Sequence, residues 1–396
     1  MHLKSLHIQN FRSLEDFKVS KLGRINLIVG KNNSGKSSVL EALRIYAANA
    51  HPAVLEEIAS GHDERFRLKE SDSVDDSFDL PFEHFFTGRI FPFDDSTKIS
   101  IGELENNSSK LTIEHCLLKT NEINSEKYTD DRPSPNYYVL NKYDAVKNDI
   151  NYDSEALLVS KNETNKFINF NTSPIRRNRF WFEASEAISS SYIPTQFISM
   201  DELANIWDTI QFSDHGDFIR EGLKFIANDF ENIAFIVNNE GVGNTSSFIS
   251  NNVARKFGMK RTAIVKLKNQ TKAIPLNSMG DGMVRVLQLL LKVYPAKGGF
   301  LLIDEFENGL HYSVQEKIWQ FLFDLAEKLD IQVFATTHSW DCIESFAKVA
   351  VENTQSEGVL FRVGRSMLTS NQGKVIATVF DEKQLLNITQ ADVEVR

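Results

Sequence analysis

A glycine-rich octapeptide near the start of the chain has the residue types needed to hold a chain of phosphates. Residues 30–37 read G-K-N-N-S-G-K-S, which is the full G-x-x-x-x-G-K-[ST] pattern. The glycines let successive backbone N–H groups turn toward phosphate oxygens, and the start of a following helix adds a favourable field. The pattern predicts that Lys36 reaches the β- and γ-phosphates of ATP and that the Ser37 hydroxyl ligates Mg²⁺. The other loop positions expected to contact the nucleotide are Asn32, Asn33, Ser34, Gly35 and Ser38.

Two acidic residues follow a short, uniformly apolar segment that predicts a buried strand, residues 300–303. Asp304 is expected to hold Mg²⁺ through water, and Glu305 to polarise the attacking water as a general base. His338 follows a second buried strand, residues 331–335. Because ligands of open α/β sheets bind at the carboxyl ends of strands, His338 is expected beside Glu305 in a catalytic role. The alternative is that the two acids only end a strand and that the histidine is structural.

Strands and helices alternate around these residues, which predicts a largely parallel α/β sheet. The remaining elements expected at this level are strands over 3–10 and 24–29, a helix over 37–48, several strands between about 96 and 190, a helical stretch from 200 to about 237, a helix over 313–329 opened by a capping box of Ser313 and Glu316, and a hairpin in the tail. The expected divisions are 1–50 and 271–396 for the two parts of the core, 51–195 for a strand-rich lobe, and 196–270 for a helical section with a hairpin.

Composition narrows the class of protein. The formal net charge of −10 argues against a general polyanion-binding surface. Cys116 and Cys342 are the only cysteines and lie far apart, so a disulfide framework or zinc site is not expected. No apolar run reaches transmembrane length and the start of the chain lacks a signal peptide, so we expect a cytoplasmic protein with no membrane contact.

The motifs together resemble ABC-type ATPases of the RecF/SMC group. Ser278-Met279-Gly280-Asp281-Gly282 lies upstream of the acidic strand, where that group has its signature motif, and residues 6–13 resemble the group's first strand. Residues 304–311 look most like the overcoming-lysogenisation-defect (OLD) branch. The resemblance covers about residues 1–50 and 270–345. It implies an ABC-type ATPase head with a mixed or parallel core sheet, and with antiparallel and helical sections inserted between the P-loop and the signature motif.

The resemblance also implies a composite site. Ser278 and Gly280 would contact the γ-phosphate of ATP bound to the P-loop of a partner copy, with Ser278 opening a helix. Lys36 and Ser278 then act in the same site only in a head-to-tail dimer or a higher homo-oligomer. Residues 307–311 would cross the interface as the D-loop, and Arg12 would lie near the nucleotide phosphates of its own subunit.

Two features depart from the family's pattern. Met279 replaces the first glycine of the usual signature. No glutamine occurs between Gln9 and Gln196, so the usual Q-loop residue is missing from its expected region. Glu83 or His84 could substitute, although a solvated loop is the plainer interpretation of both.

Three hypotheses for the use of ATP remain open at this level. The first is a stand-alone OLD-like ATPase that senses or regulates in a bacterial anti-phage system, with a separately encoded effector, plausibly a nuclease. The chain after His338 is too short for the nuclease domain of OLD proteins. The second is a RecF-like DNA repair ATPase, for which residues 176–182 (R-R-N-R-F-W-F) are the best nucleic-acid candidate. The third is an ATP-gated oligomeric scaffold with slow hydrolysis. A transporter ATPase is a weak fourth.

Overall fold

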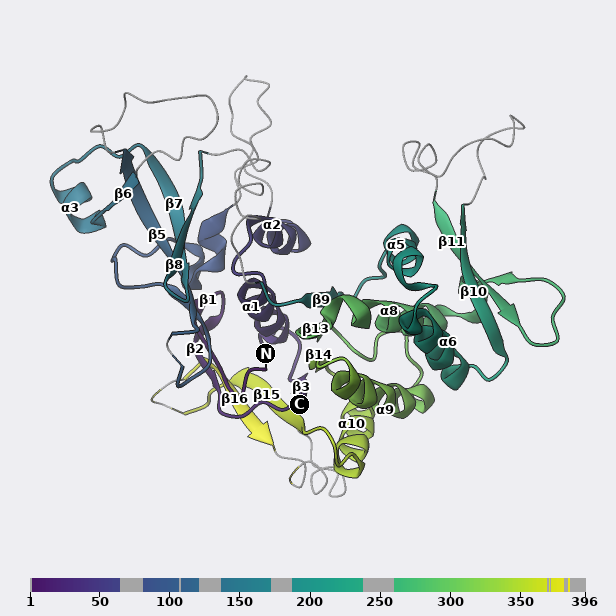
Figure 1. Cartoon of the computed structure of the whole chain (residues 1–396). Helices are drawn as coiled ribbons and strands as arrows, with labels where there is room; N and C mark the ends of the chain where they lie inside the picture. Colours follow the sequence, from purple (N-terminus) through teal and green to yellow (C-terminus); the bar gives the residue numbers. More distant parts are fainter. Residues whose placement is uncertain are drawn as a thin grey trace, which may run out of the picture.

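The structure is a computed structural model. The residues that it describes are 2–64, 81–106, 108–120, 137–171, 187–237, 260–368, 370, 372–380 and 384. Within them, two arms rise from a common base (Figure 1). The segment 176–182 lies outside the described residues.

The base is built on a six-stranded sheet in which the expected parallel core is confirmed. Neighbouring strands pair in parallel except for the last two of the chain, which form the expected tail hairpin. In spatial order the strands are β16 (Val375–Phe380), β15 (Gly358–Arg365), β3 (Ile25–Val29), β14 (Gln332–Thr337), β13 (Phe300–Ile303) and β9 (Ser190–Ile193).

Both faces of this sheet are buried, because successive side chains along a strand point to opposite sides. On β3, Leu27 and Val29 pack into one apolar cluster with the helices α8, α9 and α10, whereas Ile28 packs into a second cluster with α1. The bounds of these helices are α1 (Lys36–Ala47), α8 (Asp281–Val293), α9 (Tyr312–Lys328) and α10 (Trp340–Glu352). The sheet is thus sandwiched, and its carboxyl edge is the part left for polar residues.

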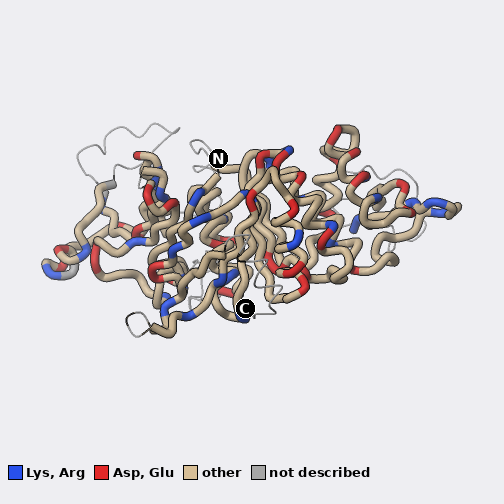
Figure 2. The backbone as a smooth tube through the Cα atoms, turned by 90° about the horizontal axis from the view of Figure 1, so that it is seen from below, with Lys and Arg blue, Asp and Glu red and all other residues tan. Residues whose placement is uncertain are grey.

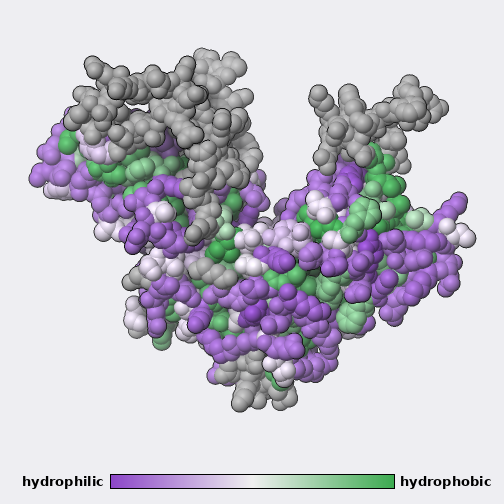
Figure 3. Space-filling model, in the orientation of Figure 1, coloured by the Kyte–Doolittle hydropathy of each residue, from purple (hydrophilic) through white to green (hydrophobic). Residues whose placement is uncertain are grey.

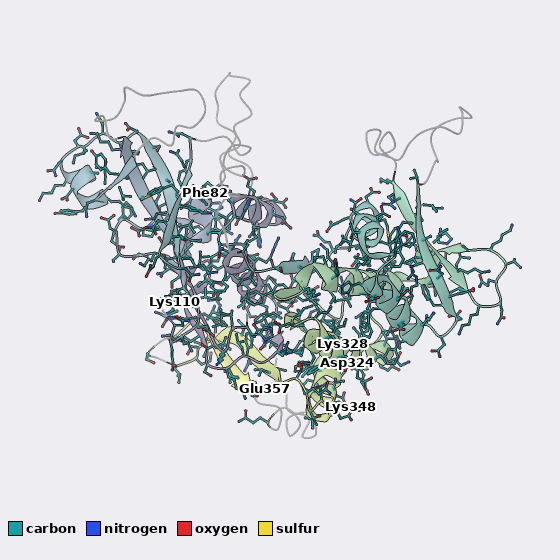
Figure 4. The ribbon with its side chains drawn as sticks, in the orientation of Figure 1. Phe82, Lys110, Asp324, Lys328, Lys348 and Glu357 are labelled. Carbon is teal, nitrogen blue, oxygen red and sulfur yellow. The ribbon has the colours of Figure 1, made fainter. Side chains whose placement is uncertain are left out.

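The base ends in α9 and α10, which pack against each other. Lys348 of α10, labelled at the foot of the molecule in Figure 4, pairs with Glu316 of α9 at 2.8 Å. The expected capping box of α9 is wrong: the N-cap is His311, whose Nδ1 accepts the N–H of Ser313 at 3.4 Å. A histidine ring at this position satisfies the same free N–H that a serine side chain would.

One arm is an antiparallel seven-stranded sheet that also contains the first two strands of the chain. Its strands are β1 (Leu6–Phe11), β2 (Leu14–Val19), β4 (Ile99–Gly102), β5 (Leu111–Thr120), β6 (Tyr137–Leu140), β7 (Ser154–Lys161) and β8 (Thr164–Asn169). The short helices α2 (Pro52–Gly61), η1 (Phe82–Phe85), η2 (Thr87–Arg89) and α3 (Lys142–Lys147) belong to the same part of the chain. Phe82 lies beside α2 in Figure 4 and stacks on Phe170 with ring centroids 4.9 Å apart. The strand-rich section expected after the P-loop is therefore present.

The other arm joins two helices to a small antiparallel sheet. The prediction of a single helical stretch in this arm is wrong in part. The stretch from Met200 to Val237 is not helical throughout: it forms α5 (Met200–Ile210), α6 (Asp214–Ile226) and the strand β10 (Phe230–Val237). β10 pairs with β11 (Arg261–Leu267), which pairs with β12 (Ile274–Pro275). Along β10 the side chains of Ile233, Phe235 and Val237 alternate with more exposed positions, and this period of two suits a strand. No helix among the described residues is long and apolar enough to span a membrane.

Candidate nucleotide site

The glycine-rich loop joins β3 to α1, which is the strand-to-helix context that the sequence pattern requires. Gly30 and Gly35 have φ values of 153° and 106°. A Cβ on Gly30 would lie 2.3 Å from the carbonyl oxygen of Val363 in β15, so this position has no room for a side chain. Asn33 also has a left-handed backbone, with φ 59°. The loop is thus wrapped closely over the sheet edge, as a phosphate cradle needs.

Lys36 lies folded over its own loop. Its Nζ donates to the carbonyl oxygens of Gly30 at 2.8 Å and of Lys31 at 3.0 Å. Burial lowers the pKa of Lys36, an effect opposed by the negative charges of Asp304, Glu305 and other nearby acids. These acids favour the charged form of the amine, which is the form able to bind phosphate.

Ser37 and Asp304 come together although they are far apart in the sequence. Ser37 Oγ lies 3.4 Å from Asp304 Oδ2, and Thr336 Oγ1 donates to Asp304 Oδ1 at 2.6 Å. A hydroxyl and a carboxylate that converge in this way form an oxygen donor set suited to Mg²⁺, which commonly keeps several waters and takes one or two protein ligands beside substrate phosphates. The residues present therefore fit the expected ion.

Glu305 and His338 are adjacent, as the strand-end reasoning predicts. His338 Nδ1 lies 3.8 Å from Glu305 Oε1 and 3.0 Å from Glu307 Oε1. Glu307 Oε1 also accepts the backbone N–H of His338 at 2.9 Å. The side chain of Glu305 is 36% exposed and can meet a water molecule, whereas that of Glu307 is 11% exposed and holds the histidine in place.

Gln196 is a residue that the sequence analysis passed over. It follows β9, the parallel neighbour of β13, and precedes α5. It lines the same cavity as Ser37 and Asp304. The sequence pattern predicts a cavity glutamine upstream of this position, because the length of the strand-rich section between the P-loop and β9 cannot be read from the motifs. The signal available was its place between a strand and the helical section. Glu83 and His84 do not line this cavity.

The cavity, about 490 Å³, lies between the two arms, where Figure 3 shows the surface hollowed. One wall comes from α1 and α2, and the other from the segment after β9, from α5 and from α8. Arg44 pairs with Glu57 at 2.7 Å and Lys292 with Glu202 on the lining. Ser37 and Asp304 thus open into a polar cleft shared by both arms.

Arg12, expected near the nucleotide phosphates, pairs with two glutamates in the structure. Its Nε lies 2.8 Å from Glu41 Oε2, and its two terminal nitrogens donate to the two oxygens of Glu64, each at 3.1 Å. Its side chain is 9% exposed. The structure therefore joins Arg12 to the P-loop helix through Glu41 and does not place it on the loop itself.

Ser278 and Gly280 precede α8 and do not line the cavity. Ser278 does not open the helix as expected: it lies in the 3-10 turn η4 (Leu276–Met279), and α8 begins at Asp281. Gly280 breaks the helix between them with φ 91°, a left-handed conformation that favours glycine. Ser278 is exposed. The two residues expected in the signature motif are therefore not part of the cavity that Ser37 and Asp304 line.

A P-loop over a parallel sheet, an acidic strand end, and an antiparallel and a helical arm between loop and signature define an ATPase of the ABC type. The chain belongs to the family described as "AAA domain, putative AbiEii toxin, Type IV TA system", which matches residues 25–341. It is 24% identical over 373 residues to a Helicobacter pylori protein named ATP/GTP phosphatase, covering 88% of this chain and 89% of that one.

Two further similarities are more limited. Over 53 residues the chain is 49% identical to the DNA double-strand break repair Rad50 ATPase of Archaeoglobus fulgidus, which covers 13% of this chain and 6% of that protein. An SMC head solved with the C-terminal winged-helix domain of ScpA aligns with 98% of this chain and 100% of that one. Its TM-score is 0.49 and its identity 11%.

Proposed function

We propose that this ATPase works as a head-to-tail dimer with two composite ATP sites, as the ATPase or sensor subunit of a bacterial defence system. The observation that carries the dimer is the separation of the two halves of the site. Ser37 and Asp304 converge within one chain, whereas Ser278 and Gly280 lie outside the cavity of their own chain. A second copy turned head to tail would supply the missing half.

Within each site the roles follow from position. Lys36 would leave the loop carbonyls to bind the β- and γ-phosphates, and Ser37 with Asp304 would hold Mg²⁺, which offsets the negative charge of the phosphates. Glu305 would accept a proton from the attacking water, with His338 beside it. Gln196 reaches the same cavity and would contact the metal or the water there.

The wider role rests on the family and on one motif. The family description names a putative toxin of a type IV system, and residues 304–311 resemble the OLD branch. The family description supports a defence role, and the resemblance to the OLD branch supports a separately encoded effector of the nuclease class that the ATPase controls. A purified chain that degraded nucleic acid without a partner would contradict this role. Figure 2 shows Lys and Arg interleaved with Asp and Glu along the described backbone, which does not favour the DNA-binding alternative.

Subunit complementation tests the composite site. Lys36→Ala and Ser278→Arg should each abolish ATP hydrolysis in homodimers. Mixing the two variants creates dimers in which one site combines Lys36 of the second variant with Ser278 of the first, so part of the phosphate release should return. If the mixture stays as inactive as its components, head-to-tail assembly is wrong.

A further inference from the structure

Arg285 links three parts of the candidate site without belonging to any motif. It lies in the second turn of α8, the helix that follows the signature residues, and is only 1% exposed. Its Nη1 donates to the carbonyl oxygen of Pro194 at 2.8 Å. Its Nη2 donates to the carbonyl oxygens of Asp304 at 2.9 Å and of Glu305 at 3.0 Å. One guanidinium therefore ties α8 to the ends of β9 and β13.

A buried charge of this kind needs a reason, because desolvation is costly and an apolar side chain would fill the space without that cost. Among the described residues no carboxylate forms an ion pair with Arg285, and its Nε has no hydrogen-bond partner there. Its partners are backbone carbonyls at the point where the acidic residues begin. The side chain is thus placed to fix backbone positions at that strand end.

The backbone that it fixes is strained. Glu305 has φ 47°, in the left-handed region, which a residue with a side chain keeps only where its surroundings impose it. Thr336 Oγ1 accepts the Glu305 N–H at 2.8 Å, and Arg285 donates to the Glu305 carbonyl. The two peptide groups that flank the Glu305 Cα are therefore both anchored, one to β14 and one to α8.

We infer that Arg285 is a positioning residue for ATP hydrolysis: it holds Glu305 of its own subunit in the left-handed conformation that aims the carboxylate at the attacking water. This role rests on the proposed role of Glu305. Lysine cannot replace Arg285, because a single ammonium group cannot donate to the ends of both β9 and β13 as the planar guanidinium does.

Steady-state kinetics of Arg285→Lys provide the first test. The kcat should fall by about 100-fold, the size of effect that a misplacement of about 1 Å produces, while nucleotide affinity stays unchanged because Lys36 and Ser37 are untouched. Arg24→Lys is the matched control: Arg24 also donates to a carbonyl, that of Ala326 at 2.9 Å, but it lies at the amino end of β3. It should keep its kcat. A loss of affinity or folding in Arg285→Lys without a fall in kcat would overturn the inference.

Mixed dimers distinguish two ways in which Arg285 could affect hydrolysis: through Glu305 of its own subunit, or through α8 on the site of the partner subunit. The first mixture combines the Lys36→Ala variant with the double variant Ser278→Arg/Arg285→Lys. Its one complete site takes Lys36 and Glu305 from the double variant, so this Glu305 lies beside the substituted position 285. The second mixture combines the double variant Lys36→Ala/Arg285→Lys with the Ser278→Arg variant. Its one complete site takes Lys36, Glu305 and an unaltered Arg285 from the Ser278→Arg subunit. Homodimers are inactive in both.

The inference predicts loss in the first mixture and retention in the second. Loss in the second mixture, in both, or in neither would overturn it. If the parent mixture of Lys36→Ala with Ser278→Arg is itself inactive, the dimer proposal fails, and the kinetics of Arg285→Lys alone decide the role of Arg285.

Discussion

Thr336 Oγ1 donates to Asp304 Oδ1 at 2.6 Å, and the same oxygen accepts the backbone N–H of the next residue, Glu305, at 2.8 Å. Thr336 itself is fully buried in β14, the strand beside the acidic strand. One hydroxyl therefore contacts both the carboxylate proposed to hold Mg²⁺ and the backbone of the candidate base. The geometry of the candidate site therefore depends on the pairing of β13 with β14.

Replacing this hydroxyl should separate chemistry from binding. Thr336→Val keeps the volume but leaves Asp304 Oδ1 and the Glu305 N–H without their partner, which should lower the free energy of unfolding by about 1–3 kcal/mol. The kcat should fall by about 100-fold through misplacement of Glu305, with little change in nucleotide affinity. Thr337→Val is the control, because Thr337 Oγ1 accepts the N–H of Ser339 at 3.1 Å, which lies outside the acidic strand. Equal kcat losses in the two variants would contradict the account.

Lys36→Ala and Glu305→Gln together distinguish an ATP-cycling machine from an ATP-gated scaffold. Removing the ammonium should weaken ATP binding by at least about tenfold, the value of a charge-assisted hydrogen bond. Glu305→Gln should bind ATP normally and lose hydrolysis. In an assay of cellular function, a cycling machine fails with both variants, whereas a scaffold fails only with Lys36→Ala.

Gln196→Ala should lower the kcat while the protein folds normally, because this side chain lines the cavity that holds Ser37 and Asp304. We expect a decrease of about 10-fold or more, as for the loss of one polar contact in a transition state. Gln355→Ala, at an exposed position, is the control. An unchanged kcat would show that Gln196 does not contribute to hydrolysis.

The pair His62 and Glu41 predicts a pH dependence of stability. The hydrogen bond that the His62 ring donates to the Glu41 carboxylate raises the pKa of His62 above its usual 6.5, and burial opposes the shift. Because the folded pKa is raised, the contribution to stability is complete below the unfolded pKa and is lost as pH rises through the folded pKa. Since the His62 side chain is 41% exposed, the effect should stay below about 1 kcal/mol.

Thermal unfolding of wild type and His62→Gln across pH 5 to 9 measures this effect. The difference in Tm should be largest at the acid end and vanish at the alkaline end. A difference that grows with rising pH would have the wrong sign. Substituting His62 also changes the charge balance around Arg12 and Glu64, which belong to the same ionic cluster. Lys348→Ala, which removes a surface charge on α10 far from this cluster in the sequence, is the control for general charge effects.

The parts of the site that follow local rules were predictable. The P-loop, the acidic residues after β13 and His338 after β14 all lie where a strand ends, and parallel strands bring their carboxyl ends to one edge. The parallel sheet itself followed from short apolar segments alternating with amphipathic helices. These signals occupy a few consecutive residues each.

What could not be predicted depends on contacts between distant segments. Arg12 meets Glu64 across an interval that no motif spans, and Arg285 reaches Pro194 only because β9 and β13 are neighbours. The place of Gln196 on the cavity lining could not be predicted for the same reason, since it depends on the strand that Gln196 follows. The strand β10 was taken for helix, because apolar residues spaced by three and four in the preceding helix α6 masked the change of period.

Light scattering of Glu305→Gln, with and without ATP·Mg²⁺, tests the central claim most directly. The variant should bind ATP without consuming it, so ATP·Mg²⁺ should add or lock a second subunit, and wild type should release phosphate. Adding Ser278→Arg to the variant should prevent this assembly. A molar mass that ignores ATP, with no phosphate release from wild type, would contradict the head-to-tail ATPase.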